Sequence, residues 1–261
     1  FNMEHPLVGG YTPEKVALRR AINLAIDIEQ ELRLVRKGQA IAAQGPVCPG
    51  VYGYDPAFKS EMTEYSVPKA RALLDMYGYK DRDGDGWREQ PDGSPLSIEY
   101  STLADGERRQ LAEQWQKNMA AIGIRMTFKI GKFPEQLKAA NAGKLQMWGV
   151  GWVGTTPDGD TFLALGSGKA KGFANKPRFE LAAFDALYEK QKALPDGPER
   201  QALMTEGQRL LVAYAPYKFH VHRIWTDMAQ PWVKGYSRNI FVRDFWKYID
   251  VDPAAQPKSS S

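Results

Sequence analysis

The sequence predicts an α/β fold built on a small, mainly parallel sheet flanked by helices. Apolar and polar residues alternate at 96–101 and again at 124–130, which is typical of strands. Between these segments Leu111, Trp115 and Met119 repeat every four residues, which indicates a helix. A strand, a crossover helix and a second strand in one sheet almost always form a right-handed unit with parallel strands. The stretch therefore predicts a βαβ unit.

The first predicted helix begins at Pro13, with Thr12 as its N-cap, and carries an apolar stripe between residues 18 and 26. Only fifteen residues precede Val16, too few to cover that stripe. We therefore expect the cover to come from other structure, and the chain to be half of a larger unit.

The remaining elements follow from caps and periodicity. Asp27 is expected to cap a second helix that stops near Gly38, and a third helix runs from Ser66 to Gly78, after an extended segment. Later helices are expected at 134–142, 179–194 and 198–214, the last capped by Asp196, with further strands at 145–150 and 217–223. Beyond Met228 aromatic residues recur without a clear period and lead into a polar tail.

Several short runs follow one another in a characteristic order. They are VALRRAINLAID at 16–27, GPVCPG at 45–50, GYDP at 53–56, KARALLDMYGY at 69–79, DGDGW at 83–87, AIGI at 121–124, GW at 151–152 with FL at 162–163, and VKGY at 233–236. Together they resemble the family 5 extracellular solute-binding proteins, which are the oligopeptide, dipeptide and nickel receptors of ATP-driven importers. The resemblance covers the chain from about residue 1 to residue 250.

This resemblance implies a secreted, periplasmic or extracellular binding protein with two lobes. Residues 1–230 would be the carboxy-terminal lobe, of the periplasmic-binding-protein type II-like class, and residues 231–261 a segment that returns to a missing amino-terminal lobe. The expected partners are a peptide-like or other small solute and an ABC permease in the inner membrane. No cofactor and no catalytic residue are expected.

Ligands of open α/β sheets lie beyond the carboxyl ends of the strands. Three predicted loops meet this condition, at 102–106, 131–134 and 151–160. The last, GWVGTTPDGD, combines a large aromatic residue, two hydroxyls, two carboxylates and three glycines. It is the leading ligand segment. Its candidate ligand residues, with weaker ones in the first loop, are Trp152, Thr155, Thr156, Asp158, Thr102 and Asp105.

Each candidate has a predicted role. Trp152 would stack on the solute, although it is equally well explained as a core aromatic residue. The threonine hydroxyls would form hydrogen bonds, and Asp158 would meet a cationic group. In peptide-binding members an acidic residue three places after the Gly-Trp pair holds the peptide amino group, and here that position is Thr155. A hydroxyl does not neutralise a buried ammonium group, so ordinary peptide binding would need Asp158 or Asp160 instead.

Two patterns suggest metal sites. Asp81, Asp83, Asp85 and Gly86 match the first half of a calcium loop, but position twelve is Asp92 and no helix follows, so an EF-hand is excluded. Calcium bound in another geometry stays open beside a turn-rich hairpin, which is the favoured interpretation. His220 and His222 would share one face of a strand, but structural zinc normally takes four ligands and no third one is apparent.

Three other features of the sequence give no evidence of a binding or catalytic site. The glycines at 149, 151 and 154 have dinucleotide-binding spacing, but TTPDG follows where a helix should begin. The single Cys48 excludes an internal disulfide and is best explained as a packed residue. The net charge of +4 is dispersed, which gives no reason to expect nucleic-acid binding. A calcium-stabilised interaction module and an α/β hydrolase are the alternative functions, and neither explains the ordered runs.

Overall fold

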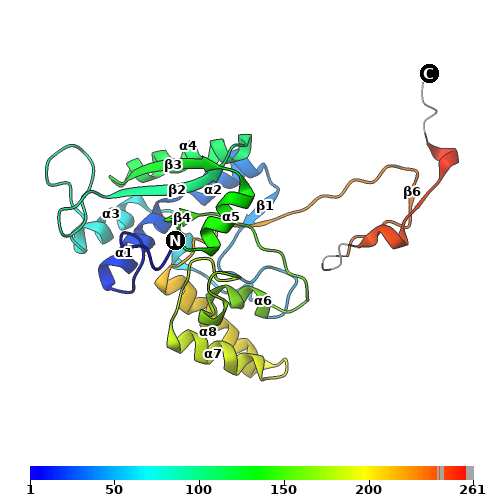
Figure 1. Cartoon of the computed structure of the whole chain (residues 1–261). Helices are drawn as coiled ribbons and strands as arrows, with labels where there is room; N and C mark the ends of the chain where they lie inside the picture. Colours follow the sequence, from blue (N-terminus) through cyan, green and yellow to red (C-terminus); the bar gives the residue numbers. More distant parts are fainter. Residues whose placement is uncertain (240, 242–243, 257–261) are drawn as a thin grey trace, which may run out of the picture.

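The computed structural model describes residues 1–239, 241 and 244–256. A sheet covered by helices forms one part of the body, and a second group of helices packs beside it (Figure 1). The orange part of the chain is a long extended segment that leaves this body, and the orange-to-red part that contains β6 lies away from it (Figure 1). Among the described residues, none of the helices combines the length and apolar composition that crossing a bilayer requires.

The sheet has the predicted parallel order, with one strand in the middle and one on each side. Its strands are β3 (Arg125–Gly131), β2 (Ser97–Leu103) and β4 (Met147–Trp148), hydrogen-bonded in that order. Helix α4 (Gly106–Ala120) makes the crossover between β2 and β3, so the predicted βαβ unit is confirmed. Trp115 and Met119 of α4 pack on Ile98 of β2 in the main core.

Strand β4 is shorter than the predicted 145–150. Before it, the side-chain oxygen of Gln146 accepts a hydrogen bond from the backbone N–H of Glu99, so a side chain stands where backbone pairing was expected. After it, the chain turns away at Gly149. Helix α5 (Phe133–Asn141) follows β3 and lies close to the predicted 134–142.

The apolar stripe of α1 (Pro13–Ala25) is fully buried, as residues Leu18 and Ile22 show. Its cover comes from later parts of this chain, chiefly α3 (Val67–Met76) and α4, whose residues share the same core. The stripe is thus covered by other structure, as expected, but that structure belongs to this chain, so the stripe itself gives no evidence of a missing half. The residues that cover α1 follow it in the sequence and do not precede it.

The second helix is interrupted. Asp27 caps α2 (Ile28–Glu31) by accepting a hydrogen bond from the N–H of Gln30 at 2.9 Å, as predicted, and a π-helical turn (Leu32–Arg36) completes the segment. The chain then forms β1 (Ala40–Ala42), which pairs antiparallel with β5 (Val221–Arg223).

The second group of helices has its own small core. It comprises α6 (Asp160–Leu163), α7 (Ala182–Lys192) and α8 (Pro198–Tyr214), with Phe184 of α7 fully buried. Two expectations fail here. Helix α7 starts three residues later than predicted, because the side chain of Asn175 bonds both the N–H and the C=O of Phe179 and keeps that segment extended. Gly197, not Asp196, is the N-cap of α8, and Asp196 pairs with Arg200 instead.

We call residues 224–256, as far as they are described, the arm, and the chain up to residue 223 the body. The arm contains the two-residue strands β6 (Val233–Lys234) and β7 (Asp250–Val251), which pair antiparallel. None of its described residues is buried. Trp225, Trp246 and Tyr248 are each at least 65% exposed.

Candidate functional site

The carboxyl ends of the three parallel strands form one edge of the sheet. Leu103 of β2 lies opposite Gly131 of β3, and Ser101 lies opposite Trp148 of β4. The three predicted loops therefore leave from the same edge. Helices α4 and α5 also begin there, so two helix N-termini with free N–H groups face the place where a ligand of an open α/β sheet binds.

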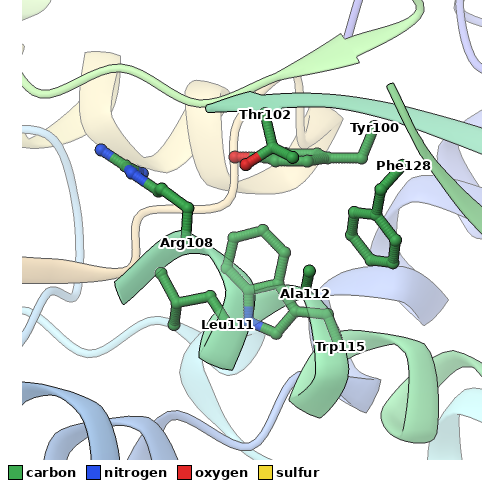
Figure 2. A pocket seen from close by; sticks show the side chains of 7 residues that line it. All are labelled: Tyr100, Thr102, Arg108, Leu111, Ala112, Trp115 and Phe128. Carbon is green, nitrogen blue, oxygen red and sulfur yellow. The ribbon is translucent and has the colours of Figure 1, made fainter. Parts of the chain in front are cut away.

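This edge is hollowed in two adjoining places that share Tyr100, Thr102 and Arg108. Figure 2 shows the first hollow between β2 and α4; it has an empty volume of about 170 Å³, part of it open to solvent. The second, of about 150 Å³, extends toward β4 and α5. Almost none of this space is wide enough for a water molecule, so the two hollows are shallow depressions and not cavities that could hold a solute.

Aromatic packing forms the floor of the first hollow. The ring of Tyr100 meets the indole of Trp115 edge-on at 5.0 Å between centroids and the ring of Phe128 at 6.2 Å. Burial raises the pKa of Tyr100 to about 12, so its hydroxyl stays protonated and able to donate a hydrogen bond at any physiological pH.

Gly149 is fixed by this tyrosine. A Cβ atom at position 149 would lie 2.1 Å from the Tyr100 hydroxyl, far inside contact distance. The chain therefore passes from β4 into the loop at 151–160 directly beside that hydroxyl, which brings the start of the leading ligand segment to the hollowed edge.

Three candidates of this loop are exposed. Trp152 is 38% exposed, and the ammonium group of Lys176 lies 5.8 Å from the centroid of its ring. Thr155 and Thr156 are exposed, and their hydroxyls have no hydrogen-bond partner among the described residues. All three side chains are free to meet a solute.

Asp158 already forms an ion pair with the side chain of Arg200. Its two carboxylate oxygens accept hydrogen bonds from one guanidinium nitrogen of Arg200, at 3.0 and 2.8 Å, and one of them also accepts from the N–H of Asp160 at 2.9 Å. Arg200 in turn lies 5.1 Å from the ring centroid of Tyr52. This ion pair joins the loop to α8. The predicted contact of Asp158 with a cationic solute would have to share or replace it, and stays a prediction.

The two weaker candidates differ in position. Thr102 is buried, 7% exposed, and lines both hollows. Asp105 is exposed and caps α4, accepting a hydrogen bond from the N–H of Arg108 at 2.8 Å. Thr102 therefore lies in the candidate site, whereas the carboxylate of Asp105 has a structural partner at its rim.

Four residues of the edge were missed. Tyr100 and Arg108 line both hollows, and Gln136 and Trp148 line the second one. Gln136 donates to the C=O of Thr102 and accepts from the indole N–H of Trp148 at 3.1 Å. Arg108 could have been predicted from the sequence, because it is the third residue of a helix that follows a strand, and such a residue lies beside the end of the strand. For Gln136 and Trp148 the sequence offers no such signal.

The remaining clusters have structural partners. Asp81 accepts hydrogen bonds from the N–H groups of Gly84 and Gly86 at 2.7 and 2.9 Å, within the predicted turn-rich loop. Its carboxylate oxygens and those of Asp83, Asp85 and Glu89 come within 4.8 Å of one another, and calcium binding there stays a prediction.

The two histidines lie in different surroundings. The Nδ1 atom of His220 is 3.3 Å from a carboxylate oxygen of Glu31, and its ring lies 4.9 Å from that of Trp115, whereas burial lowers the pKa of His222. Cys48 is half-buried, and burial raises the pKa of its thiol. After Gly154, the first described helix is the four-residue α6, which does not provide the helix that a dinucleotide site requires.

Residues 1–173 match the model of the bacterial extracellular solute-binding proteins, family 5. The chain is 30% identical over 233 residues to di/tripeptide-binding protein 2 of Pseudomonas aeruginosa, covering 87% of this chain and 41% of that protein. It is 27% identical to heme-binding protein A of Haemophilus influenzae, covering 92% of this chain and 42% of that protein. The chain thus spans about two fifths of the length of these relatives.

Solved structures show the same fold. The oligopeptide-binding protein AppA from Bacillus subtilis, in complex with a nonapeptide, superposes with a TM-score of 0.82 at 21% identity, covering 97% of this chain and 49% of that one. DppA from Helicobacter pylori, in complex with the peptide STSA, gives a TM-score of 0.78 at 24% identity over 96% of this chain and 46% of that one. The α/β class with a type II binding-protein lobe is confirmed.

Proposed function

The chain belongs to the family 5 bacterial extracellular solute-binding proteins, and on this basis we propose that it forms one wall of the solute-binding cleft in the receptor of an ABC importer. The receptor would be periplasmic or extracellular, take up a peptide-like or other small solute, and deliver it to a membrane permease. Residues 1–230 would be the carboxy-terminal lobe, and residues 231–261 would return toward an amino-terminal lobe.

The observation that supports this proposal best is the small size of the hollows at the sheet edge. Neither is a cavity that could hold a solute, while the loop beside them presents Trp152, Thr155 and Thr156 to solvent. A surface with ligand-type residues but no enclosed pocket is what one wall of a two-walled cleft offers. Closure of a second lobe would complete the site, and differential affinity for the closed state would drive that closure.

The solute class follows from the residues that the loop offers. The relatives in the comparison are named for di/tripeptides and for heme, so membership of the family leaves the solute open. Thr155 supplies a hydroxyl where the resemblance leads us to expect an acid, and Asp158 is neutralised by Arg200. Asp160, the other possible replacement, already accepts hydrogen bonds from the Tyr188 hydroxyl and the Gln191 amide. We therefore infer that the solute is not held through a free amino group at this loop.

A catalytic role has no support from the site. The hydroxyls at the edge have no histidine within hydrogen-bond distance among the described residues, and His220 pairs with Glu31. We propose that the protein binds its solute without turnover. Recovery of the solute chemically unchanged after incubation with the protein would test this.

The decisive experiment uses the product of the whole gene. The protein is purified without unfolding, native mass spectrometry identifies the solute that it carries, and calorimetry measures the affinity for that solute after it has been removed. We expect Trp152→Ala to weaken binding at least about tenfold, since a stacked aromatic residue of a closed cleft contributes well over 1 kcal/mol.

Trp87→Ala is the matched control. Trp87 also lies under a cation, with the guanidinium carbon of Arg125 at 5.2 Å, but Arg125 begins β3 at the opposite end of the sheet. Its replacement should leave affinity unchanged. If both variants bind the solute as tightly as the parent protein, the loop at 151–160 is not part of the site.

A further inference from the structure

We propose that Tyr52 and Arg200 are positioning residues of the receptor: they hold the far end of the loop at 151–160 and so fix its outward-facing side chains for the solute, which they do not touch. This inference rests on the proposed function and adds to it the part of the chain on which the shape of the loop depends. It also gives Asp158 a role inside the protein, as the point by which Arg200 holds the loop.

The middle of the loop has little support of its own. Among the described residues, positions 151–156 take part in no hydrogen bond, either through the backbone or through the side chains. The ring of Trp152 lies 5.8 Å from the ammonium group of Lys176, which is a weak contact at an exposed site. A segment without hydrogen bonds takes its conformation from its two ends.

The two ends of the loop belong to different cores. The first end continues β4, whose Met147 lies in the main core with the sheet. The second end, residues 157–160, leads into α6, which lies with α7 and α8 beside the sheet (Figure 1). Phe184 and Met204 belong to the second core there, and Tyr52 packs against it. The attachment of residues 157–160 to the helices therefore sets the shape of the loop.

Tyr52 makes this attachment with both its backbone and its side chain. Its N–H donates to the C=O of Pro157 at 2.8 Å, and its own C=O accepts from the N–H of Gly159 at 2.9 Å. A Cβ atom at position 159 would lie 2.5 Å from that carbonyl oxygen, so this approach requires glycine. The Tyr52 hydroxyl donates to the C=O of Gly197 at 2.9 Å and accepts from its N–H at 2.8 Å. Because Gly197 is the N-cap of α8, Tyr52 joins the loop to the start of that helix.

Arg200 makes the second attachment, from the first turn of α8. One terminal nitrogen donates to both carboxylate oxygens of Asp158, the other donates to Asp196 at 2.5 Å, and Nε donates to the C=O and the side-chain oxygen of Gln191, each at 3.2 Å. The side chain is only 8% exposed. A sheltered guanidinium with all three nitrogens bonded is held in one orientation, so it defines where Asp158 lies.

Asp160 is held by the same helices. Its carboxylate accepts hydrogen bonds from the Gln191 amide at 2.5 Å and from the Tyr188 hydroxyl at 3.4 Å, and its N–H donates to Asp158. Both carboxylates of the loop are therefore bonded within the protein. The groups that the loop turns outward are the indole ring and the two threonine hydroxyls.

The attachment affects binding through the order of the loop. If the second end were released, residues 151–156 would sample many conformations in the free protein, and the solute would have to order them when it binds. Affinity would then fall although no contact with the solute was removed. This consequence distinguishes a positioning residue from a residue that touches the solute.

The first experiment measures the order of the loop in the chain without solute. NMR follows the hydrogen exchange of the Gly159 and Asp160 amides and the indole N–H signal of Trp152. In Arg200→Gln we expect exchange of both amides to accelerate about tenfold or more, because hydrogen bonds to charged groups are the strong ones, and the Trp152 signal to shift or broaden. Arg200→Lys keeps the charge and one donor direction and should restore part of the protection.

Arg88→Gln is the matched control. Arg88 is also sheltered, with a 13% exposed side chain, an ion pair with Asp75 and a hydrogen bond from Nε to the C=O of Ile122 at 2.8 Å. Ile122 precedes β3, so this arginine lies at the opposite end of the sheet. Its loss should lower the stability of the chain while the exchange of Gly159 and the signal of Trp152 stay as in the parent protein.

The second experiment measures affinity in the whole-gene product, by calorimetry with the solute that it carries. Arg200→Gln should weaken binding about tenfold and Arg88→Gln should leave it unchanged, because only the first loosens the loop. Tyr52→Phe removes one hydroxyl and keeps the ring and the backbone bonds, so it should weaken binding severalfold. It carries the same comparison if Arg200→Gln does not fold, which amide dispersion shows.

Three results would overturn the proposal: parent-like exchange and Trp152 signal in folded Arg200→Gln and Tyr52→Phe, an equal change in Arg88→Gln, or a loosened loop with unchanged affinity. A parent whole-gene product that binds no solute would instead contradict the receptor function. The exchange data would still decide whether Arg200 and Tyr52 hold the loop, so the two failures are distinguishable.

Discussion

The body and the arm place the same residue types in opposite environments. Trp115 and Phe184 of the body are 4% and 0% exposed, whereas Trp225 and Trp246 of the arm are 65% and 70% exposed. Salt bridges differ in the same way: Arg200 in the body has an 8% exposed side chain, and Arg238 in the arm a 45% exposed one. The body is stabilised by burial within the chain, and the arm presents aromatic surface outward.

Exposed aromatic surface is typical of segments that pack on a partner. In the proposed receptor this partner would be the other lobe, and the arm would be the part of this chain that reaches it. The comparison predicts that changes in the body cost stability and equivalent changes in the arm do not.

The largest difference is expected from aromatic truncation. Phe184→Ala removes a fully buried ring and should lower the free energy of unfolding by about 3–5 kcal/mol. Trp246→Ala removes a larger but exposed ring and should change it by no more than about 0.5 kcal/mol. Urea denaturation of the chain measures both. Similar losses in the two variants would mean that the arm packs on the body in solution.

Acid should destabilise the body through Glu31, whose side chain is fully buried. Burial alone would raise the pKa of Glu31, but the hydrogen bonds and charges of His220 and Arg36 lower it to about 2 from 4.5. The resulting stability is present above about pH 4.5 and is lost as the pH falls through 2. The shift corresponds to a loss on the order of 3 kcal/mol.

Glu31→Gln isolates this contribution. The variant should be less stable than the parent at pH 7, and the two unfolding free energies should converge between pH 4.5 and pH 2. Chemical denaturation at a series of pH values provides the curves. Parallel curves over this range would show that Glu31 is not the group responsible.

A smaller effect is expected from matched salt bridges. Asp158→Asn weakens the bidentate pair with the sheltered Arg200 and should cost about 1–2 kcal/mol, reduced because Asp158 itself is 37% exposed. Asp227→Asn weakens the corresponding pair with Arg238 in the arm and should leave the stability unchanged, because solvent screens both charges. Thermal unfolding of both variants compares them, and an equal shift in Tm would contradict the distinction between body and arm.

The smallest free energy is expected for local opening of the arm. Trypsin should cut after Lys234 or Arg238 before it cuts in the body, because exposed segments with few buried contacts open at almost no cost. Mass spectrometry of early fragments identifies the first site. Addition of the solute to the whole-gene product should slow this cleavage if the arm contacts the other lobe.

The sequence predicted the βαβ unit because two alternating segments and a four-residue repeat report directly on which faces are buried. The sequence-based prediction of element boundaries was wrong where one side chain binds backbone groups that a regular strand or helix would otherwise use. The Gln146 side chain takes the N–H of Glu99 and shortens β4, and Asn175 holds Phe179 and delays α7. Such bonds join residues distant in the sequence or depend on one rotamer, so no periodicity reveals them.

For the candidate site, the sequence correctly placed three loops at one sheet edge, because parallel strands end together. It did not show that Asp158 is neutralised, since Arg200 lies forty-two residues away. It also did not select Tyr100, because the place of this side chain at the edge depends on how β2 packs against α4 in three dimensions.

The contact between Tyr100 and Gly149 has a consequence for related sequences. Since a Cβ at position 149 would lie 2.1 Å from the tyrosine hydroxyl, the two positions cannot vary independently. A homologue with alanine or any larger residue in place of Gly149 must have lost the tyrosine, shifted its ring, or redirected the chain that leaves β4. These two columns of an alignment should therefore change together, and a homologue that keeps the tyrosine should keep the glycine.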